Sequence, residues 1–275
     1  MNSSIRILSL NIGLKSDLTD LLTLISVHKL DVVMLQEVRI TDEQINQQLG
    51  NHGFTGKVNI DVENPQIPGT ALAWRSTLPI RQVSAAVPCR MQYALLGSHS
   101  IFNIYAPSGS DKKVERGLFF AREVFQAFSL GSSSLILGGD FNCVLGPIDI
   151  ENGTGFNQKK CPQLSDLVTI KNLQDIFRYV YPRTKEFTFF RTNCAPSRLD
   201  RFYLSHDLLR EVKLIKHVAS LSDHCGVLLD MRFQDVVFSK KKSTSITYWK
   251  LNTRILRDED FLENFAALWE SLKLT

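Results

Sequence analysis

Apolar positions near the start of the chain follow first the pattern of a strand and then that of a helix. Residues 5–10 form a β-prone run that ends at the polar residue Asn11. Over residues 17–28 the apolar positions recur every three or four residues, which predicts a helix. Residues 31–35 form a continuous apolar run that reaches a polar end at Glu37. A strand, a helix and a second buried strand in succession are typical of a sheet covered by helices.

The same periodicities predict the later elements. Apolar runs predict strands over residues 69–74, 80–87, 92–97, 101–105, 135–140, 187–190, 199–204 and 226–231. Helical spacing predicts helices over residues 41–49, 112–130 and 164–171, and the first begins with Thr41 and Gln44 spaced as in a capping box. The chain is therefore expected to be an α/β protein with two halves of similar pattern, although the halves share no sequence repeat.

The run over residues 135–142 ends in two glycines followed by Asp140, Phe141 and Asn142. Glycine lets a backbone turn sharply and approach a ligand closely. Asp140 and Asn142 are two residues apart and can point the same way if strand geometry continues through them. The alternative interpretation is a strand that ends in an ordinary Asp/Asn turn.

The composition indicates a globular domain. Of the 275 residues, 44% are hydrophobic and 22% charged, and no apolar run is long enough to span a bilayer. The first four residues do not resemble a signal peptide, and five scattered cysteines favour a reducing compartment over a disulfide framework or a zinc site. We therefore expect no membrane partner. A net charge of +4 is compatible with a nucleic-acid partner without requiring one.

The composition changes after residue 233, so residues 1–233 are expected to form one domain. Lysines and serines over residues 240–245 predict a solvated linker, and residues 258–272 predict an amphipathic helix. The apolar stripe of that helix can pack on this domain or face another one.

Polar residues recur where the predicted strands end. They are Asn11, Glu37, Tyr105, Asp140, Asn142, Asp200, Ser222, Asp223 and His224. Each has a structural explanation when taken alone, as a turn residue, a core aromatic or a structural histidine. Ligand sites of α/β proteins gather at strand ends, so their recurrence predicts one shared site.

A set of motifs in this order resembles the endonuclease/exonuclease/phosphatase superfamily over residues 5–231. The motifs are Ser9-Leu10-Asn11, Leu35-Gln36-Glu37, Asn103-Ile104-Tyr105-Ala106-Pro107, Gly138-Gly139-Asp140-Phe141-Asn142, Phe187-Thr188-Phe189-Phe190, Arg198-Leu199-Asp200-Arg201 and Leu221-Ser222-Asp223-His224. The resemblance implies a four-layered, DNase I-like α/β sandwich, in which two mixed β-sheets pack face to face with helices outside.

Within the superfamily, the chain most resembles the apurinic-type endonuclease domain of LINE-type (non-LTR) retrotransposons. The segment Tyr248-Trp249-Lys250-Leu251-Asn252 is similar to the one that joins this domain to reverse transcriptase in some such elements. The resemblance implies that residues 234–275 lead toward a downstream reverse transcriptase region of the same polyprotein.

The resemblance also implies a metal site and catalytic roles. Mg²⁺, with Mn²⁺ as a substitute, prefers oxygen ligands and needs few carboxylates. Glu37 would be the principal ligand, with Asn11 adjacent and Asp223 as a further ligand, and no small-molecule cofactor is expected. The reaction is hydrolysis of a phosphodiester.

Catalytic roles are assigned by the same resemblance. Asp140 would orient or deprotonate the attacking water, with Asn142 and Asn11 beside it. His224, held by Asp200, would donate to a phosphoryl oxygen, and Tyr105 would offer its hydroxyl to the phosphate.

Several residues in or beside the motifs are candidates for contact with the substrate. Thr188 and Ser222 are candidates for contact with DNA, as are four arginines that flank the motifs, Arg39, Arg191, Arg198 and Arg201. A strand threonine and ordinary surface arginines are the alternative interpretations. Loops over residues 205–212 and near Gly109 are expected to read the target sequence.

The implied function is to nick one strand of double-stranded target DNA and leave a 3′-hydroxyl that primes reverse transcription. Such a protein would be synthesised in the cytoplasm and act on genomic DNA in the nucleus.

Two alternatives remain. An apurinic DNA-repair endonuclease or exonuclease would usually carry a tryptophan-rich strand at residues 187–190 and a tyrosine at the position of Arg201. An inactive DNA-binding module would typically lack Glu37, Asp140 or His224, and all three are present.

Overall fold

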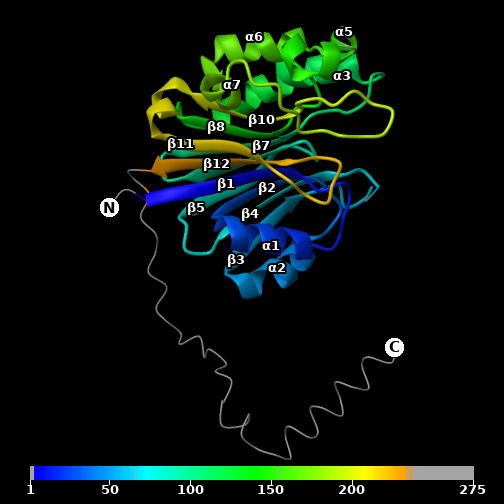
Figure 1. The fold of residues 1–275 in the computed structure, drawn as a ribbon. Coiled ribbons are helices and arrows are strands. Elements are labelled where there is room, and N and C mark those ends of the chain that lie inside the picture. Colours follow the sequence, from blue (N-terminus) through cyan, green and yellow to red (C-terminus); the bar gives the residue numbers. More distant parts are fainter. Residues whose placement is uncertain (1–2, 65, 154, 234–235, 237–275) are drawn as a thin grey trace, which may run out of the picture. The chain divides into compact units, whose positions relative to one another are not determined.

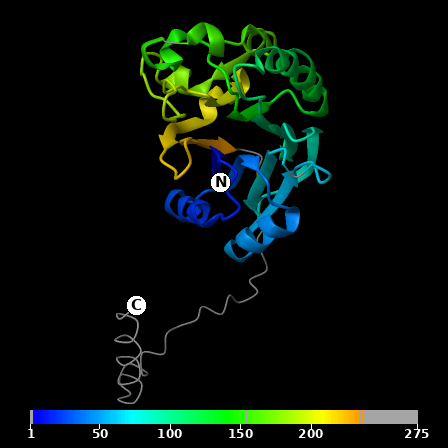
Figure 2. The same cartoon turned by 90° about the vertical axis from the view of Figure 1, so that its right-hand side faces the viewer.

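Four layers build the described part of the chain in the computed structural model, which describes residues 3–64, 66–153, 155–233 and 236. Two six-stranded mixed sheets lie face to face, with helices outside each of them (Figures 1 and 2). The predicted α/β sandwich is confirmed. The predicted linker and the helix over residues 258–272 lie outside the described residues.

The first sheet has the strand order β11-β12-β1-β2-β4-β3. Its strands are β1 (Ser3–Asn11), β2 (Val32–Val38), β3 (Phe54–Asn59), β4 (Gly69–Arg75), β11 (Val212–Val218) and β12 (Gly226–Phe233). Its outer face is covered by α1 (Thr19–His28) and α2 (Asp42–Leu49), the blue helices of Figure 1. The predicted capping box of α2 is confirmed, because Thr41 Oγ1 accepts from the Gln44 N–H and Gln44 Oε1 accepts from the Thr41 N–H.

The second sheet has the strand order β5-β6-β7-β8-β10-β9. Its strands are β5 (Ile80–Val87), β6 (Met91–Leu96), β7 (His99–Tyr105), β8 (Leu135–Asp140), β9 (Leu173–Asp175) and β10 (Asp200–Ser205). Outside it lie α3 (Lys113–Leu118), α4 (Phe125–Ala127), α5 (Phe156–Lys159), α6 (Pro162–Ile170) and α7 (Ile176–Val180). A π-helical segment, Phe119–Val124, connects α3 to α4, so the predicted helix over residues 112–130 is helical but not uniformly α.

Three strands that the periodicity did not predict, β3, β9 and β11, lie at sheet edges. Edge strands need fewer apolar residues, and β11 exposes Lys213 and Leu214. The predicted strand over residues 187–190 is instead an irregular segment in which Phe189 bridges to Ser197 and His224.

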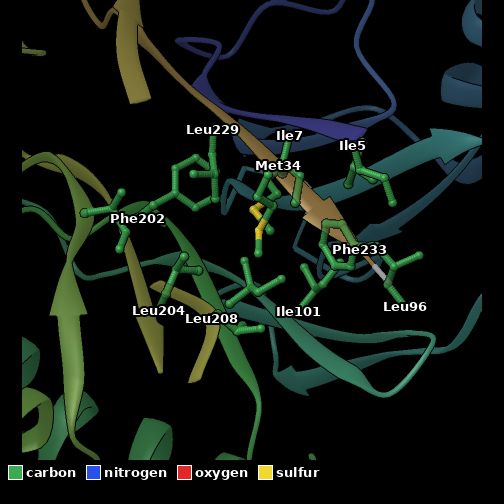
Figure 3. Close-up of a cluster of buried hydrophobic side chains, with 14 of the residues drawn as sticks. Ile5, Ile7, Met34, Leu96, Ile101, Phe202, Leu204, Leu208, Leu229 and Phe233 are labelled. Atoms are coloured by element: carbon green, nitrogen blue, oxygen red, sulfur yellow. The ribbon is translucent and has the colours of Figure 1, made fainter. Parts of the chain in front are cut away.

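Period-two alternation decides which side chains lie between the sheets. On β1, Ile5 and Ile7 face the second sheet, whereas Leu8 and Leu10 pack under α1 and α2. Figure 3 shows the inter-sheet cluster, where Ile5 and Ile7 gather with residues of the second sheet such as Phe202. Burying one such side chain contributes roughly 1.5–3 kcal/mol.

The inter-sheet core becomes polar toward one end. Gln36 Nε2 donates to Asn103 Oδ1 at 2.7 Å and to Ser9 Oγ at 3.2 Å. Asn103 Nδ2 in turn donates to the carbonyls of Leu35 and Ala71. This buried polar network joins the two sheets and marks the point where the apolar core ends.

A cluster of ion pairs lies on the outer side of β10. Arg198 Nε is 2.9 Å from Asp149 Oδ1, and Arg198 Nη2 is 2.6 Å from Asp175 Oδ2. Arg201 lies 3.7 Å from each of these two aspartates, and Arg178 also binds Asp149. Arg198 and Arg201 are fully buried. The prediction that they contact DNA phosphates is therefore wrong, because their charges are neutralised inside the protein.

The ion cluster predicts a stability defect for Asp149→Asn. Burial opposes ionisation of Asp149, but the guanidinium groups of Arg201 and Arg198 outweigh it and hold the pKa of this carboxyl well below its usual range. Removing the charge leaves Asp175 as the one aspartate that still pairs with buried Arg198 and Arg201 in this cluster, so the free energy of unfolding should fall by about 3–5 kcal/mol in urea titrations at pH 7.

The defect should shrink in acid, because a depressed pKa stabilises the fold fully above the unfolded-state pKa of about 3.9. That contribution is lost progressively as the pH falls from there through the lower folded-state pKa. The matched control is exposed Asp166→Asn, which should stay within about 0.5 kcal/mol of the wild type. Equal stability of Asp149→Asn and the wild type at pH 7 would contradict this role.

Candidate active site

Strand register brings the predicted polar residues to one edge of the sandwich. Asp140 ends β8, where it pairs with Tyr105 of parallel β7 and with Asp200 of antiparallel β10. In the other sheet Asn11 ends β1, and its side chain crosses to the second sheet, where Nδ2 donates to Asp140 Oδ2 at 3.0 Å. The predicted gathering of these residues is therefore present.

The two glycines before Asp140 serve packing rather than ligand approach. A Cβ at Gly138 would lie 2.6 Å from Met34 Sδ, and one at Gly139 would lie 2.0 Å from the Ile104 carbonyl oxygen. Gly139 has a φ of +153°, which side chains rarely permit. The glycines thus let β8 approach its neighbours closely enough to place Asp140 between the sheets.

Asp140 is almost fully buried and is held by amides. Oδ1 accepts from the Asn142 N–H at 2.9 Å, and Oδ2 accepts from the side chains of Asn11 and Asn142. Asn142 has a φ of +49°, a left-handed conformation that asparagine tolerates. Burial and the nearby Asp200 carboxylate raise the pKa of Asp140 to about 7. The group can therefore exchange a proton near neutral pH.

His224 connects Asp140 to Asp200. Its Nδ1 is 2.9 Å from Asp200 Oδ2, and its Nε2 is 3.9 Å from Asp140 Oδ2. Burial opposes charging of the imidazole, but the carboxylates of Asp200 and Asp140 outweigh it and raise the pKa of His224 to about 10. His224 is thus a cation at neutral pH, and both of its ring nitrogens are donors.

Thr188 positions Asp200 instead of contacting substrate. The side chain is fully buried, and Oγ1 accepts from the backbone N–H groups of Leu199 and Asp200 at 3.0 and 3.1 Å. The predicted substrate contact of Thr188 is therefore wrong. The next residue, Phe189, packs against His224, and the centroids of the two rings are 5.0 Å apart.

Glu37 reaches the site through an irregular backbone. The pairing of β2 with β4 shifts between Gln36 and Val38, and Glu37 has a φ of +56°. A left-handed glutamate costs conformational energy and is found mostly where surrounding structure holds it for a purpose. Its Oε1 accepts from the Tyr105 hydroxyl at 3.3 Å. Burial and the carboxylates of Glu37 and Asp140 raise the pKa of Tyr105 well above its usual value, so the hydroxyl remains a donor.

A cavity of about 400 Å³ opens at these strand ends, and we name it the strand-end cavity. Its lining includes five predicted site residues, Glu37, Asn142, Arg191, Asp223 and His224. The loop predicted near Gly109 also lines it. The loop over residues 205–212 does not, because β10 is antiparallel to β8 and carries it to the opposite end of the sheet. That part of the prediction is wrong.

Cations line the same cavity, and two of them were missed by the sequence analysis. Arg191 was predicted, and its Nε is 3.2 Å from Asp223 Oδ2. Lys159 and Arg116 were not predicted, because they lie in segments without a motif. Arg116 is almost fully buried, and its Nη1 donates hydrogen bonds to the loop carbonyls of Pro107 and Gly109.

Two of the predicted substrate contacts have neighbours within the protein. Ser222 Oγ accepts from the His224 N–H at 3.2 Å and shapes the turn before it. Arg39 is exposed and donates to the Gln66 carbonyl at 2.7 Å. Contact of either residue with a substrate stays a prediction.

Two groups of residues could hold a divalent metal ion. Asp140, Asp200 and His224 offer ligand atoms within 4.8 Å of one another, so this buried cluster could hold one. Glu37 and Asp223 line the strand-end cavity and carry carboxylate oxygens. Asp223 Oδ1 lies beside Gly13, since a Cβ added at Gly13 would be 4.0 Å from it. An all-oxygen set completed by waters and a ligand phosphate suits Mg²⁺. We favour the second set, because the ring nitrogens of His224 already face two carboxylates.

The charge on His224 gives a prediction that needs no assay of activity. In Asp200→Asn the imidazole keeps its burial but loses one carboxylate, so its pKa should fall from about 10 by about 1 to 3 pH units. The measurement is an NMR titration of the His224 ring resonances. Asp230→Asn removes a buried carboxylate elsewhere and should leave His224 unchanged. An unaltered titration in Asp200→Asn would contradict the pairing.

Within the described residues, no helix combines the length and apolarity needed to cross a membrane.

Comparison with solved structures finds the same fold in DNA-processing enzymes. The AP endonuclease LMAP from Leishmania major is 18% identical, with a TM-score of 0.68 over 84% of this chain and 88% of that one. An AP endonuclease from Archaeoglobus fulgidus is 15% identical, with a TM-score of 0.71 over 86% and 100%. The 3′ phosphatase NExo from Neisseria, bound to a product DNA hairpin, is 18% identical, with a TM-score of 0.68 over 83% and 100%.

These identities show a shared fold, and the family follows from the sequence profile. The profile of the Endonuclease/Exonuclease/phosphatase family matches residues 8–224, which is most of the chain. That span runs from β1 to His224 and so contains the strand ends that form the site. The chain belongs to the endonuclease/exonuclease/phosphatase family.

Proposed function

We propose that this protein is a divalent-metal-dependent phosphodiesterase that cleaves DNA in the manner of an apurinic endonuclease. The observation that carries the proposal is the buried cluster of Asp140, His224 and Asp200 behind a cavity that Glu37 also enters. The cluster pairs a carboxyl that can accept a proton near pH 7 with a fixed cation.

A bound Mg²⁺ or Mn²⁺ would supply positive charge to the phosphate, and Glu37 with Asp223 would hold it. The chain's own residues contribute the remaining steps. Asp140 accepts the proton of the attacking water, because its raised pKa makes it a base matched to neutral pH. Asn11 and Asn142 fix the orientation of the carboxylate, so that it does not reorganise during attack.

Phosphoryl charge develops as the water oxygen bonds to phosphorus and the bond to the leaving sugar oxygen breaks, with that oxygen taking a proton from solvent. Cationic or hydroxyl donors stabilise this charge. His224 offers its Nε2–H from the edge of the cavity, held in place by Asp200. Tyr105 offers a hydroxyl that stays protonated. Arg191, Lys159 and Arg116 add positive charge to a cavity that also holds two carboxylates. This balance suits a phosphate that binds together with a divalent ion.

The nature of the substrate is inferred from relatives. Two structures of the same fold are AP endonucleases, and a third, a 3′ phosphatase, was solved with product DNA. Both activities hydrolyse a phosphate ester in DNA, so we infer that DNA is the substrate here and that an abasic site is the first lesion to test.

A second candidate is nicking of intact DNA by a retrotransposon endonuclease, before target-primed reverse transcription in the nucleus. Two departures from the repair pattern support it. Residues 187–190 lack tryptophan, and Arg201 stands where repair enzymes commonly have tyrosine. Arg201 turns outward into the ion cluster with Asp149, so that departure also has a structural role.

The two candidates differ in the DNA that is cut. We expect the protein with Mg²⁺ to incise a duplex carrying a tetrahydrofuran abasic analogue at least about tenfold faster than the matched intact duplex, a factor worth 1.4 kcal/mol. Gel assays should run both duplexes, a 3′-phosphate duplex and supercoiled plasmid in parallel. Preferred nicking of intact plasmid would favour the retrotransposon candidate instead.

Metal dependence is tested with Glu37→Gln. This variant should need more Mg²⁺ for the same rate, while exposed Glu43→Gln should behave as wild type. If no DNA is cleaved by the folded wild type under any of these conditions, the proposed function is wrong.

A further inference from the structure

Lys159 is held in the strand-end cavity by two uncharged partners. It ends α5, and its side chain lines the strand-end cavity together with His224 and Arg191. Nζ donates to Ser197 Oγ at 2.7 Å and lies 5.4 Å from the centroid of the Phe189 ring. One hydroxyl and one aromatic face thus fix an ammonium group that would otherwise be free to rotate.

The charge on Lys159 has no counter-ion in the part of the chain that the structure describes. No carboxylate there forms an ion pair with Nζ, although the side chain is half-buried. Burial lowers the pKa of Lys159 from its usual value, and Cys194 opposes this effect. Arg191, Arg198 and Arg201 differ in this respect, since each faces an aspartate.

The hydrogen bonds of Ser197 orient its hydroxyl oxygen toward this ammonium. Ser197 is fully buried, and its hydroxyl donates to the Ala195 carbonyl at 2.8 Å, which leaves the oxygen to accept from Lys159. The Ser197 backbone is fixed in turn by hydrogen bonds with Phe189. Since the ring of Phe189 also contacts His224, the ammonium and the imidazole lie against the same aromatic side chain.

The Lys159 ammonium is anchored, has no counter-ion among the described residues and lies in the same cavity as His224. These features favour binding of an anionic ligand. We propose that Lys159 binds the phosphodiester group next to the one that is hydrolysed, on the same DNA strand, and that Ser197 positions its ammonium. The hydrolysed group belongs near His224 and Glu37, whereas the ammonium of Lys159 is held at Ser197. Lysine acts at such a site as a point charge on phosphate oxygens. This inference rests on the proposed function.

The first test compares variants of two adjacent lysines. Lys159→Met keeps an unbranched aliphatic side chain and removes the charge, so KM should rise about tenfold with kcat within about threefold. The slope of log affinity against log salt should become shallower by about 1. Lys159→Arg should restore part of the loss, and Ser197→Ala should reproduce part of it. Lys160→Met is the control, because Lys160 lines other surface grooves and should match wild type.

The second test places the partner phosphate. Substrates with a single methylphosphonate at successive positions flanking the cleaved bond are compared for wild type and Lys159→Met. At one flanking position the wild type and Lys159→Met should cleave the substrate at the same rate, because the methylphosphonate there lacks the negative charge that Lys159 would bind. If Lys159→Met stays equally impaired at every position, or loses kcat with KM unchanged, the inference is overturned.

Binding of uncleaved duplex in Ca²⁺ separates this inference from the proposed function. A shallower salt slope in Lys159→Met would support the phosphate contact even if the wild type cleaved no DNA. An unchanged slope would overturn the contact even if the wild type cleaved DNA efficiently.

Discussion

Packing of two sheets through their inner faces is the constraint on which this structure depends. Every second residue of the central strands must fill the space between the sheets, as Ile5 and Ile7 do on β1. Further along the strand the same inner positions carry Ser9 and Asn11. Buried polar side chains are tolerated only when they are hydrogen-bonded. Ser9 accepts from Gln36 of the neighbouring strand, and Asn11 donates to Asp140 of the opposite sheet. The site is thus the polar end of the core.

The same alternation separates two charged clusters on one strand. Asp200 faces inward and holds His224, whereas Arg201 faces outward and meets Asp149 and Asp175. Both clusters are buried, but their consequences differ. The outer ion pairs compensate one another and stabilise the fold. The inner group leaves a protonated imidazole beside a carboxyl whose pKa is near neutral, a combination suited to proton transfer.

Sequence periodicity predicted the buried strands and the gathering of Asn11, Asp140, Asp200 and His224, because polar residues at the ends of apolar runs share one edge. It could not predict side-chain partners that come from irregular segments. Thr188 and Arg198 look like substrate contacts in a motif, yet long-range hydrogen bonds and ion pairs bury both. Lys159 carries no motif, and only the fold brings it into the strand-end cavity.

The function proposed for this protein depends on Asp140 acting as the base for phosphodiester hydrolysis. The most direct test is the single-turnover rate of Asp140→Asn with Mg²⁺ on the DNA that the wild type cleaves fastest. We expect a loss of about 10²- to 10⁴-fold in a variant that circular dichroism shows to be folded, since the amide keeps the shape of the carboxylate but cannot accept the proton. A rate within tenfold of the wild type in the folded variant would contradict it.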